Sequence, residues 1–255
     1  MTDHLGRAFA FLRRGDVHGT SERPFRYGTA VFTPELPLRY DSNLLYVDRL
    51  EPDTSAAELE AEAERVFGDA GLAHRALLFR DAAAGERLAP DFSGWDVDRH
   101  IIMAQLRRPD QPIETTGVVE VGSDALRAAR RAQIESYPWG RPEVATQLLD
   151  AKHLLSGWVD VRCFAVMVGG AVVSYADLYT SDGDAQIEDV GTLEEHRGRG
   201  YAKAVVTRAA DEARAAGAEF VFLVADGQDW PKELYARLGF DVVGRYVKLL
   251  KRPPL

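Results

Sequence analysis

The stretch Ile187–Ala202, IEDVGTLEEHRGRGYA, decides the fold, because it runs from a strand into a helix through a loop with two glycines and two arginines. We predict a strand over 187–193, and alanine and valine at helical spacing predict the helix over 201–216. The glycines allow close approach of a ligand, and the N–H groups at a helix start favour an anion. Arg197 and Arg199 can add charge-assisted hydrogen bonds, so the stretch predicts a pyrophosphate site.

Two familiar phosphate motifs do not fit this loop. It lacks the Lys-Ser/Thr pair of a P-loop, and Gly198-x-Gly200 lacks the third glycine of the dinucleotide fingerprint. Taken alone, the loop is equally compatible with a tight glycine turn that carries two solvated arginines.

Outward from this stretch, the second half of the chain predicts the order β-α-α-β-β-β-α-β-α-β-β. After a leading helix over 3–14, the first half predicts β-β-α-β-α-β, which repeats part of that order. We interpret the repetition as a degenerate duplication; an unrelated α/β segment is the alternative. The polar, proline-containing segment 107–116 is the best linker, so we expect domains at 1–115 and 116–255. The predicted helices of the second half are 124–137, 142–158, 201–216 and 229–239, and its strands are 117–121, 161–168, 171–179, 187–193, 220–224, 240–243 and 245–250.

The composition favours a soluble protein of the cytoplasm. The 31 basic and 40 acidic residues give a net charge of −9, which disfavours a nucleic-acid partner and suits a positively charged substrate such as an amine. The single cysteine excludes a disulfide framework, and the histidines have no ligand spacing, so no metal is expected. We see no signal peptide, and the longest uncharged stretch, Cys163–Ala176, is too short to span a membrane.

Two motifs together resemble those of the GNAT superfamily of acetyl-CoA-dependent N-acetyltransferases. Arg197–Ala202, RGRGYA, matches the family's Arg/Gln-x-x-Gly-x-Gly/Ala at a strand–helix junction. Tyr235–Phe240, YARLGF, matches its Tyr-x-x-x-Gly-Phe at a helix end. The resemblance covers about 116–255 and implies a mixed α/β (α+β) fold, with a mostly antiparallel sheet flanked by helices. The first half would then be a degenerate GNAT-like domain or a lid.

The resemblance also implies which residues bind acetyl-CoA as co-substrate. The main chain of the strand would hold the pantetheine arm and the thioester carbonyl, and the loop would hold the pyrophosphate. The family's asparagine after the fifth strand is replaced here by the stretch Ala225–Asp229, so contacts from that loop are not expected. The first half has no such loop motif and should not bind acetyl-CoA. The cofactor-binding candidates are Gly191, Thr192 and Leu193 in the strand and Arg197, Gly198, Arg199, Gly200, Tyr201 and Ala202 in the loop.

Acetyl transfer to an amine requires a base, because an alkylammonium is protonated at neutral pH. Glu188 and Asp189 are the candidate bases; side chains alternate along a strand, so only one should face the site unless a bulge intervenes, and we favour Glu188. Alternatively, both are strand-edge charges in salt bridges. Tyr235 is the candidate general acid for the leaving thiolate, and its alternative is a packing role.

We therefore expect an N-acetyltransferase that moves an acetyl group from acetyl-CoA to the amine of a small molecule or a protein by direct attack. Cys163 lies in an apolar strand and is expected to be an inert core residue, not a nucleophile. The alternative is a non-catalytic acyl-CoA-binding or regulatory module. We expect neither a nucleic-acid partner nor a membrane partner.

Overall fold

The computed structural model describes residues 3–18, 20–155 and 157–253, and the chain divides into two compact units that interleave in sequence. Unit 1 comprises residues up to 11, 102–225 and 229–243; unit 2 comprises 12–101, 226–228 and 244–255. This differs from the predicted division between residues 115 and 116. The reason is that strand pairing and burial join segments far apart in the chain, which a linker-like composition cannot reveal.

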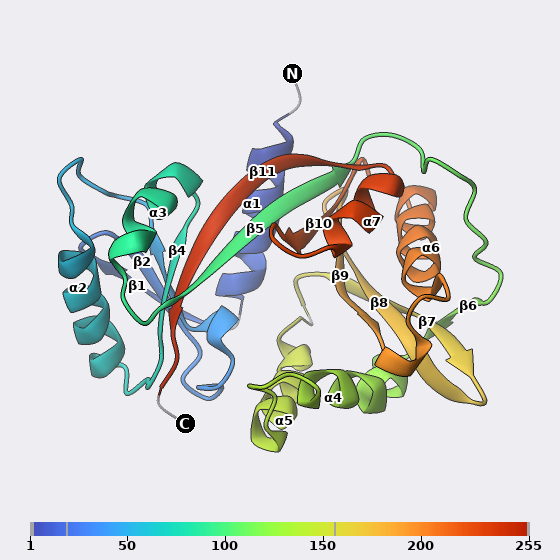
Figure 1. Cartoon of the computed structure of the whole chain (residues 1–255), viewed down its shortest axis with the longest axis horizontal. Coiled ribbons are helices and arrows are strands. Elements are labelled where there is room, and N and C mark those ends of the chain that lie inside the picture. Colours follow the sequence, from blue (N-terminus) through green and yellow to red (C-terminus); the bar gives the residue numbers. More distant parts are fainter. Residues whose placement is uncertain (1–2, 19, 156, 254–255) are drawn as a thin grey trace. The chain divides into compact units, whose positions relative to one another are not determined.

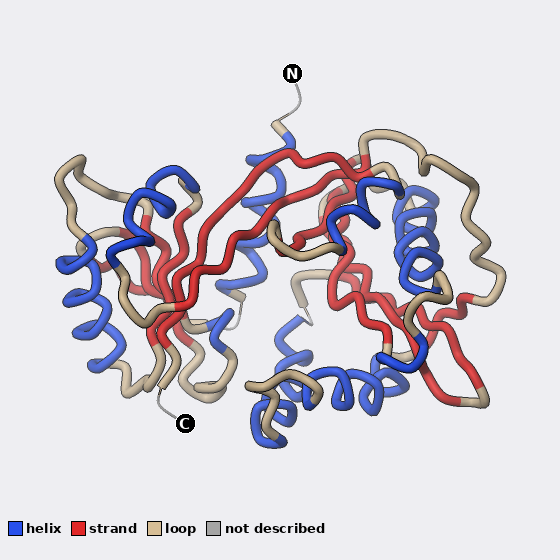
Figure 2. Tube along the Cα trace, in the orientation of Figure 1, coloured by secondary structure: helices blue, strands red, loops and turns tan. Residues whose placement is uncertain are grey.

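Five strands of unit 1 follow one another in the order β10-β9-β8-β7-β6 (Figures 1 and 2). Neighbouring strands are antiparallel, except that β9 and β10 are parallel. This mixed, mostly antiparallel sheet confirms the predicted fold class. The strands are β6 (Val118–Val121), β7 (Asp160–Val168), β8 (Ala171–Ser181), β9 (Asp184–Thr192) and β10 (Phe220–Asp226).

Helices of unit 1 cover both faces of these strands. Cys163 of β7 packs with Ala129, whereas its neighbour Arg162 pairs with Glu212 at 2.7 Å. Because successive side chains of a strand point to opposite faces, α4 and α6 lie on opposite sides of the sheet. The helices are α4 (Arg127–Glu135), α5 (Pro142–Asp150), α6 (Tyr201–Ala215) and α7 (Pro231–Arg237), with the 3₁₀ turns η3 (Ser123–Leu126), η4 (Ala151–Leu155) and η5 (Glu194–His196).

Unit 2 is completed by the last strand of the chain. Its strands β1, β2 and β3 are successively antiparallel, β3 and β4 are parallel, and β4 pairs antiparallel with residues 247–251 of β11. Three strands, β5, β10 and β11, and the helix α1 contribute residues to both units; β10 contributes only Asp226 to unit 2. The elements are α1 (His4–Val17), β1 (Ser21–Phe25), β2 (Gly28–Phe32), η1 (Tyr40–Ser42), β3 (Leu44–Val47), α2 (Ala56–Asp69), β4 (Arg75–Phe79), α3 (Ala82–Leu88), η2 (Ala89–Asp91), β5 (Asp96–Gln105) and β11 (Phe240–Lys251).

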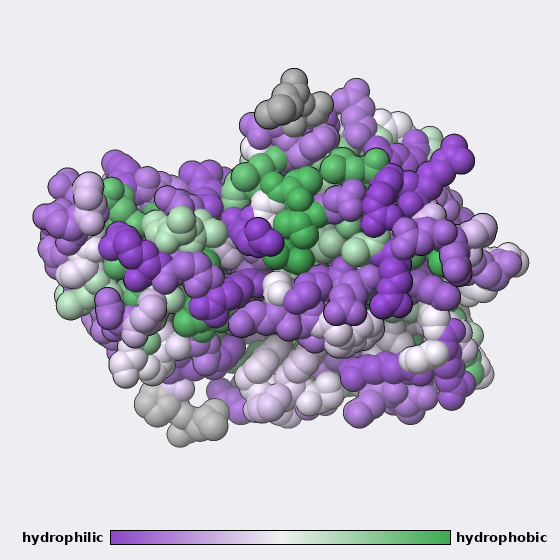
Figure 3. Space-filling model, turned by 45° about the horizontal axis from the view of Figure 1, so that its top comes forward, coloured by the Kyte–Doolittle hydropathy of each residue, from purple (hydrophilic) through white to green (hydrophobic). Residues whose placement is uncertain are grey.

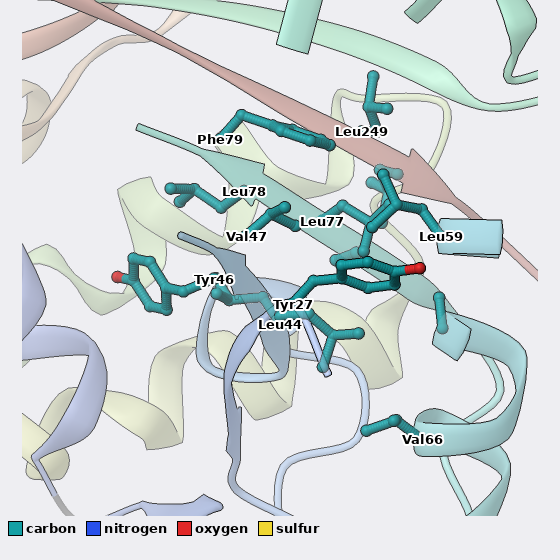
Figure 4. Close-up of a cluster of buried hydrophobic side chains, with 14 of the residues drawn as sticks. Tyr27, Leu44, Tyr46, Val47, Leu59, Val66, Leu77, Leu78, Phe79 and Leu249 are labelled. Carbon is teal, nitrogen blue, oxygen red and sulfur yellow. The ribbon is translucent and has the colours of Figure 1, made fainter. Parts of the chain in front are cut away.

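The core of unit 2 gathers side chains from α2, β3, β4 and β11 (Figure 4). Leu59, Leu77 and Leu249 are at most 1% exposed. Helix α3 lies close to β11, since a Cβ on Gly85 would come within 2.7 Å of the Val247 Cβ. Glycine therefore lets the two backbones approach at this point.

The two units repeat one motif, a parallel crossover from strand through helix to strand. In unit 1 it is β9-α6-β10 and in unit 2 it is β3-α2-β4. This agrees with the predicted repetition of element order. Strand β1 was not predicted; its Pro24 and its exposed pattern are typical of an edge strand.

Some predicted boundaries are wrong. The final pair of strands is one continuous strand, β11, and the helix predicted over 142–158 ends at Asp150, after which η4 begins at Ala151. The helix predicted over 124–137 is η3 followed by the shorter α4, and the helix predicted over 229–239 is α7, which is two residues shorter at each end. The sequence predicts two strands in place of β11 because Gly244 lies between them and glycine interrupts a strand pattern. In the structure, Gly244 lies within β11.

Polar residues cover most of the face drawn in Figure 3. Within the described ranges, no helix has the length and apolar character needed to cross a bilayer.

Shortening the Leu249 side chain of β11 should destabilise unit 2, although Leu249 lies in the second half of the sequence. We expect Leu249→Ala to cost about 2–5 kcal/mol of unfolding free energy, because it leaves a cavity in a fully buried site. Amides of β4 should then exchange faster with solvent. Leu106→Ala, at a side chain that is 50% exposed, is the matched control. A change confined to residues 116–243 would contradict the assignment of β11 to unit 2.

Candidate functional site

The site begins where β9 and β10 separate. Their parallel register runs from Asp184 and Phe220 to Ile187 and Leu223, whereas the pairing of β9 with β8 continues to Thr192. From Glu188 on, the main chain of β9 therefore has a strand partner on one edge only among the described residues. The other edge is available to a ligand that can bond to peptide groups.

A β-bulge lies at this point of separation. Asp177 is opposite Glu188 and Tyr175 is opposite Gly191, so two residues of β9 oppose one of β8. Asp189, within the bulge, has a φ of +52°, a conformation that is uncommon for residues other than glycine. The structure thus contains the bulge that allows Glu188 and Asp189 to depart from the strict alternation of side chains along a strand.

The carboxylate of Asp189 is held by two cations. Arg130 Nε donates to Asp189 Oδ2 at 2.7 Å, and Lys152 Nζ donates to the same oxygen at 3.0 Å. The same cations also bind Asp177, which is 1% exposed: Lys152 at 2.9 Å, and Arg130 through a further ion pair. We call Arg130, Lys152, Asp177, Tyr179 and Asp189 the ion network. Asp189 thus fits the structural alternative considered for it, a salt-bridged charge.

Glu188 lies beside the ion network but outside its ion pairs. Gln186 Nε2 donates to its Oε2 at 2.5 Å. Burial, and then the neighbouring charge of Asp189, raise the pKa of Glu188 to about 7. A carboxylate with this pKa accepts a proton readily at neutral pH, which is the property required of a general base.

Tyr235, on α7, is buried near the same charges. Its side chain is 8% exposed and its ring meets Phe240 edge-on at 6.5 Å. Burial, followed by the charges of Glu188 and Asp229, raises the pKa of Tyr235 to about 12. The hydroxyl therefore keeps its proton throughout the physiological range and can donate it.

The three predicted main-chain contacts of β9 are not equivalent. Leu193 N–H donates to Val173 O at 3.0 Å. In an antiparallel ladder, this bond means that the adjacent residues Thr192 and Ser174, which lie opposite each other, form a non-hydrogen-bonded pair. The peptide groups of Thr192 consequently point to the edge away from β8. Leu193 is turned to β8 instead, and its carbonyl accepts from His196 N at 2.9 Å.

Gly191 serves packing within the bulge. A Cβ there would lie 2.4 Å from the Tyr175 ring, and Ser174 Oγ already donates to the Gly191 carbonyl at 3.0 Å. Glycine at this position thus allows a close approach to Tyr175. Of the three strand residues, Thr192 is the one that the structure directs toward the free edge of β9.

The predicted glycine loop connects β9 to α6. Gly198 and Gly200 have φ of +74° and +82°, which explains why glycine occurs at both positions. Gly200 is the N-cap of α6 and supplies no side chain, so the first N–H groups of the helix are not capped by one. Arg197 and Arg199 are exposed. An anion at this end of α6 would meet free N–H groups, the positive end of the helix dipole and two guanidinium groups.

The loop is attached to the strand by Arg197, whose Nε donates to Thr192 O at 3.2 Å. Tyr201 and Ala202 follow as half-buried residues of the first helical turn. His196, just before the loop, has a buried Nδ1 without a hydrogen-bond partner in the structure. Strand edge and loop are therefore one continuous site.

Sequence reasoning missed Arg130, Lys152, Asp177 and Tyr179 as neighbours of the site. The available signal was Asp177, a charged residue inside an apolar strand run, which is rarely buried without partners. Cys163 is 2% exposed, and burial and Asp177 raise its pKa to about 12, as suits an inert core residue.

Comparison with known proteins identifies the fold that carries this site. Residues 126–240 match the sequence profile of the Acetyltransferase (GNAT) family. No curated protein matches the chain.

Several solved structures share the fold at low identity. A functionally unknown conserved protein from Staphylococcus epidermidis has a TM-score of 0.68 and 18% identity, covering 93% of this chain and 96% of that one. A GCN5-related N-acetyltransferase from Kribbella flavida has a TM-score of 0.61 and 19% identity, with coverage of 98% and 95%. A tandem GNAT protein from the clavulanic acid biosynthesis pathway has a TM-score of 0.57 and 14% identity, with coverage of 80% and 74%. The last likeness agrees with the repetition of fold seen within this chain.

Proposed function

Because residues 126–240 form an acetyltransferase domain of the GNAT family, we propose that the protein transfers an acetyl group from acetyl-CoA to an amine. The observation that carries this proposal is the position of Glu188, whose pKa is near 7, at the point where β9 leaves β10. At this position a proton acceptor, the Glu188 carboxylate, lies next to the free edge of β9. The acceptor would be an amine of a small molecule or of a protein, a class that suits the net charge of −9.

The loop before α6 supports binding of the co-substrate. The residues that would hold its pyrophosphate are those of the predicted loop, Arg197 to Ala202, through uncapped N–H groups and two arginines. The pantetheine arm, which carries amide groups, would extend the sheet along the free edge of β9 by hydrogen bonds to its main chain. Acetyl-CoA would supply the thioester that is attacked.

Thr192 is the residue of β9 best suited to stabilise negative charge on the thioester oxygen. Its peptide groups point to the free edge, and a peptide N–H directed at a developing oxyanion is a common source of rate acceleration. This modifies the expectation for Gly191 and Leu193, which would contribute to the shape of the strand.

The reaction we propose is direct. Glu188 removes a proton from the acceptor ammonium, and the neutral amine nitrogen bonds to the acetyl carbon. The carbon–sulfur bond breaks with its electrons going to sulfur, and the nitrogen loses its second proton to solvent, which leaves a neutral amide. Tyr235 gives its proton to the thiolate, whose conjugate acid has a pKa near 8.5, and regains a proton from solvent. The thiol of Cys163 takes no part, because its raised pKa keeps it protonated.

A thiol-release assay with acetyl-CoA and a panel of amines tests the function. We expect turnover that rises with pH through about 7 as Glu188 loses its proton, since only the carboxylate form is a base. Glu188→Gln should lower turnover about 10²- to 10⁴-fold and remove that pH limb. Tight CoA binding without transfer to any amine would instead favour a binding or regulatory module.

Removing only the Tyr235 hydroxyl tests the acid. Tyr235→Phe keeps the ring against Phe240, so CoA affinity should change little while turnover falls about 10²- to 10⁴-fold. Tyr27→Phe is a matched control, because Tyr27 is also buried but lies in unit 2, and its hydroxyl has no hydrogen-bond partner among the described residues. If Tyr235→Phe turns over like wild type, the proton comes from solvent.

Calorimetry should find one CoA site per chain. The start of α2, the counterpart of α6 in unit 2, is closed by a capping box in which Ser55 and Glu58 bond each other's backbone N–H. A carboxylate at this position would repel a pyrophosphate. Replacing Arg197 and Arg199 by alanine should weaken binding about tenfold or more, and Arg26→Ala, next to Glu58, should not. A stoichiometry of two would be inconsistent with this difference.

A further inference from the structure

The ion network fixes the one residue of β9 that adopts a left-handed conformation. Asp189 accepts hydrogen bonds from both Arg130 and Lys152, which approach from α4 and η4. All three donors of the Lys152 ammonium are used, on Asp177 at 2.9 Å, Tyr179 at 3.1 Å and Asp189 at 3.0 Å. The bulge is thereby tied to two elements outside the sheet.

Arg130 is also held by several partners. It is 3% exposed, and besides the two carboxylates it donates to Ser123 Oγ at 3.0 Å and to Ser123 O at 3.3 Å. Most donors of the two cations are therefore used by groups of the protein itself. The remaining contact of the ion network with the site is through the main chain from Asp189 to Glu188 and through the field of its charges.

We propose that Lys152 and Asp189 are positioning residues for Glu188, which together lock the β9 bulge and act on the Glu188 carboxylate with opposite charge. The inference rests on the proposed role of Glu188 as the base. It assigns to Asp189 a function different from proton transfer, although Asp189 is the other acidic residue at this point of the strand.

If the ion network had only a structural role, replacing its residues would affect Glu188 differently. The charge of Asp189 raises the pKa of Glu188 and the charge of Lys152 lowers it, in addition to the larger effect of burial. Neutralising one or the other should therefore move the proton affinity of Glu188 in opposite directions, whereas loss of packing would not. The groups that act on Glu188 or are acted on by it are Asp189 on β9, Asp177 and Tyr179 on β8, Lys152 on η4 and Tyr235 on α7.

The test is a carbon-13 NMR titration of the Glu188 carboxyl in the full chain, with the signal assigned by its loss in Glu188→Gln. We expect Asp189→Asn to lower the midpoint and Lys152→Met to raise it, each by about one pH unit. Asparagine tolerates the left-handed conformation, so Asp189→Asn removes charge while keeping the bulge. Lys152→Arg, which keeps the charge, should stay near the wild-type midpoint.

A matched control is Arg7→Met. It breaks another ion pair of β9, between Arg7 Nε and Asp184 Oδ1 at 2.8 Å, at the opposite end of the strand from Thr192. Its Glu188 midpoint should equal that of wild type. Midpoints that move in the same direction in Asp189→Asn and Lys152→Met, or that do not move, would overturn the proposal; should Lys152→Met not fold, Asp189→Asn alone decides.

The pH profile of kcat/KM gives a second readout. Its acidic limb should shift with the NMR midpoint in each variant, while Arg7→Met leaves it in place. A wild-type protein that acetylates no amine would refute the proposed function, but the NMR titration would still decide whether the ion network acts on Glu188. The two failures are therefore distinguishable.

Discussion

Strands β9 and β10 remain paired only as far as Ile187 and Leu223, and the extra residue of the adjoining bulge redirects the rest of β9 along β8. Every part of the candidate site depends on this separation. It exposes the peptide groups of Thr192, brings Glu188 to the end of the paired stretch, and sets where the chain enters the loop before α6. A regular parallel pair would have bonded the same peptide groups to β10 and left no edge for a ligand.

The parts of the site that follow from local conformation could be predicted from the sequence, and the parts that follow from distant contacts could not. The glycine loop was recognisable because positive φ angles require glycine at Gly198 and Gly200. The sequence favoured Glu188 over Asp189 but could not show what distinguishes them, since their difference arises from Arg130 and Lys152, which are 59 and 37 residues away from Asp189 in the chain. No spacing rule connects such residues.

The fold shows the same contrast. Helix α6 and the hairpin of β7 and β8 carry their periodicity and turn residues within a few positions, and the structure has them close to where they were expected. The pairing of β11 with β4 joins Val247 to Phe79, and the sequence gives no sign of it. The N-terminal ends of α2 and α6 show that a few residues are enough to make two copies of one motif differ. Ser55 and Glu58 cap the first N–H groups of α2, whereas Gly200 leaves those of α6 without a side-chain cap.

The position of β11 also bears on how the polypeptide is made. Residues 247–251 pair with β4, and Val247, Leu249 and Leu250 belong to the core of unit 2. A ribosome therefore adds more than 160 residues after β4 before the strand that pairs with it is made. During that interval the edge of β4 is without this partner, and an unpaired edge is where nascent chains associate with one another. The sheet of unit 2 can close at this edge only after β11 has been synthesised, however early its other strands have emerged.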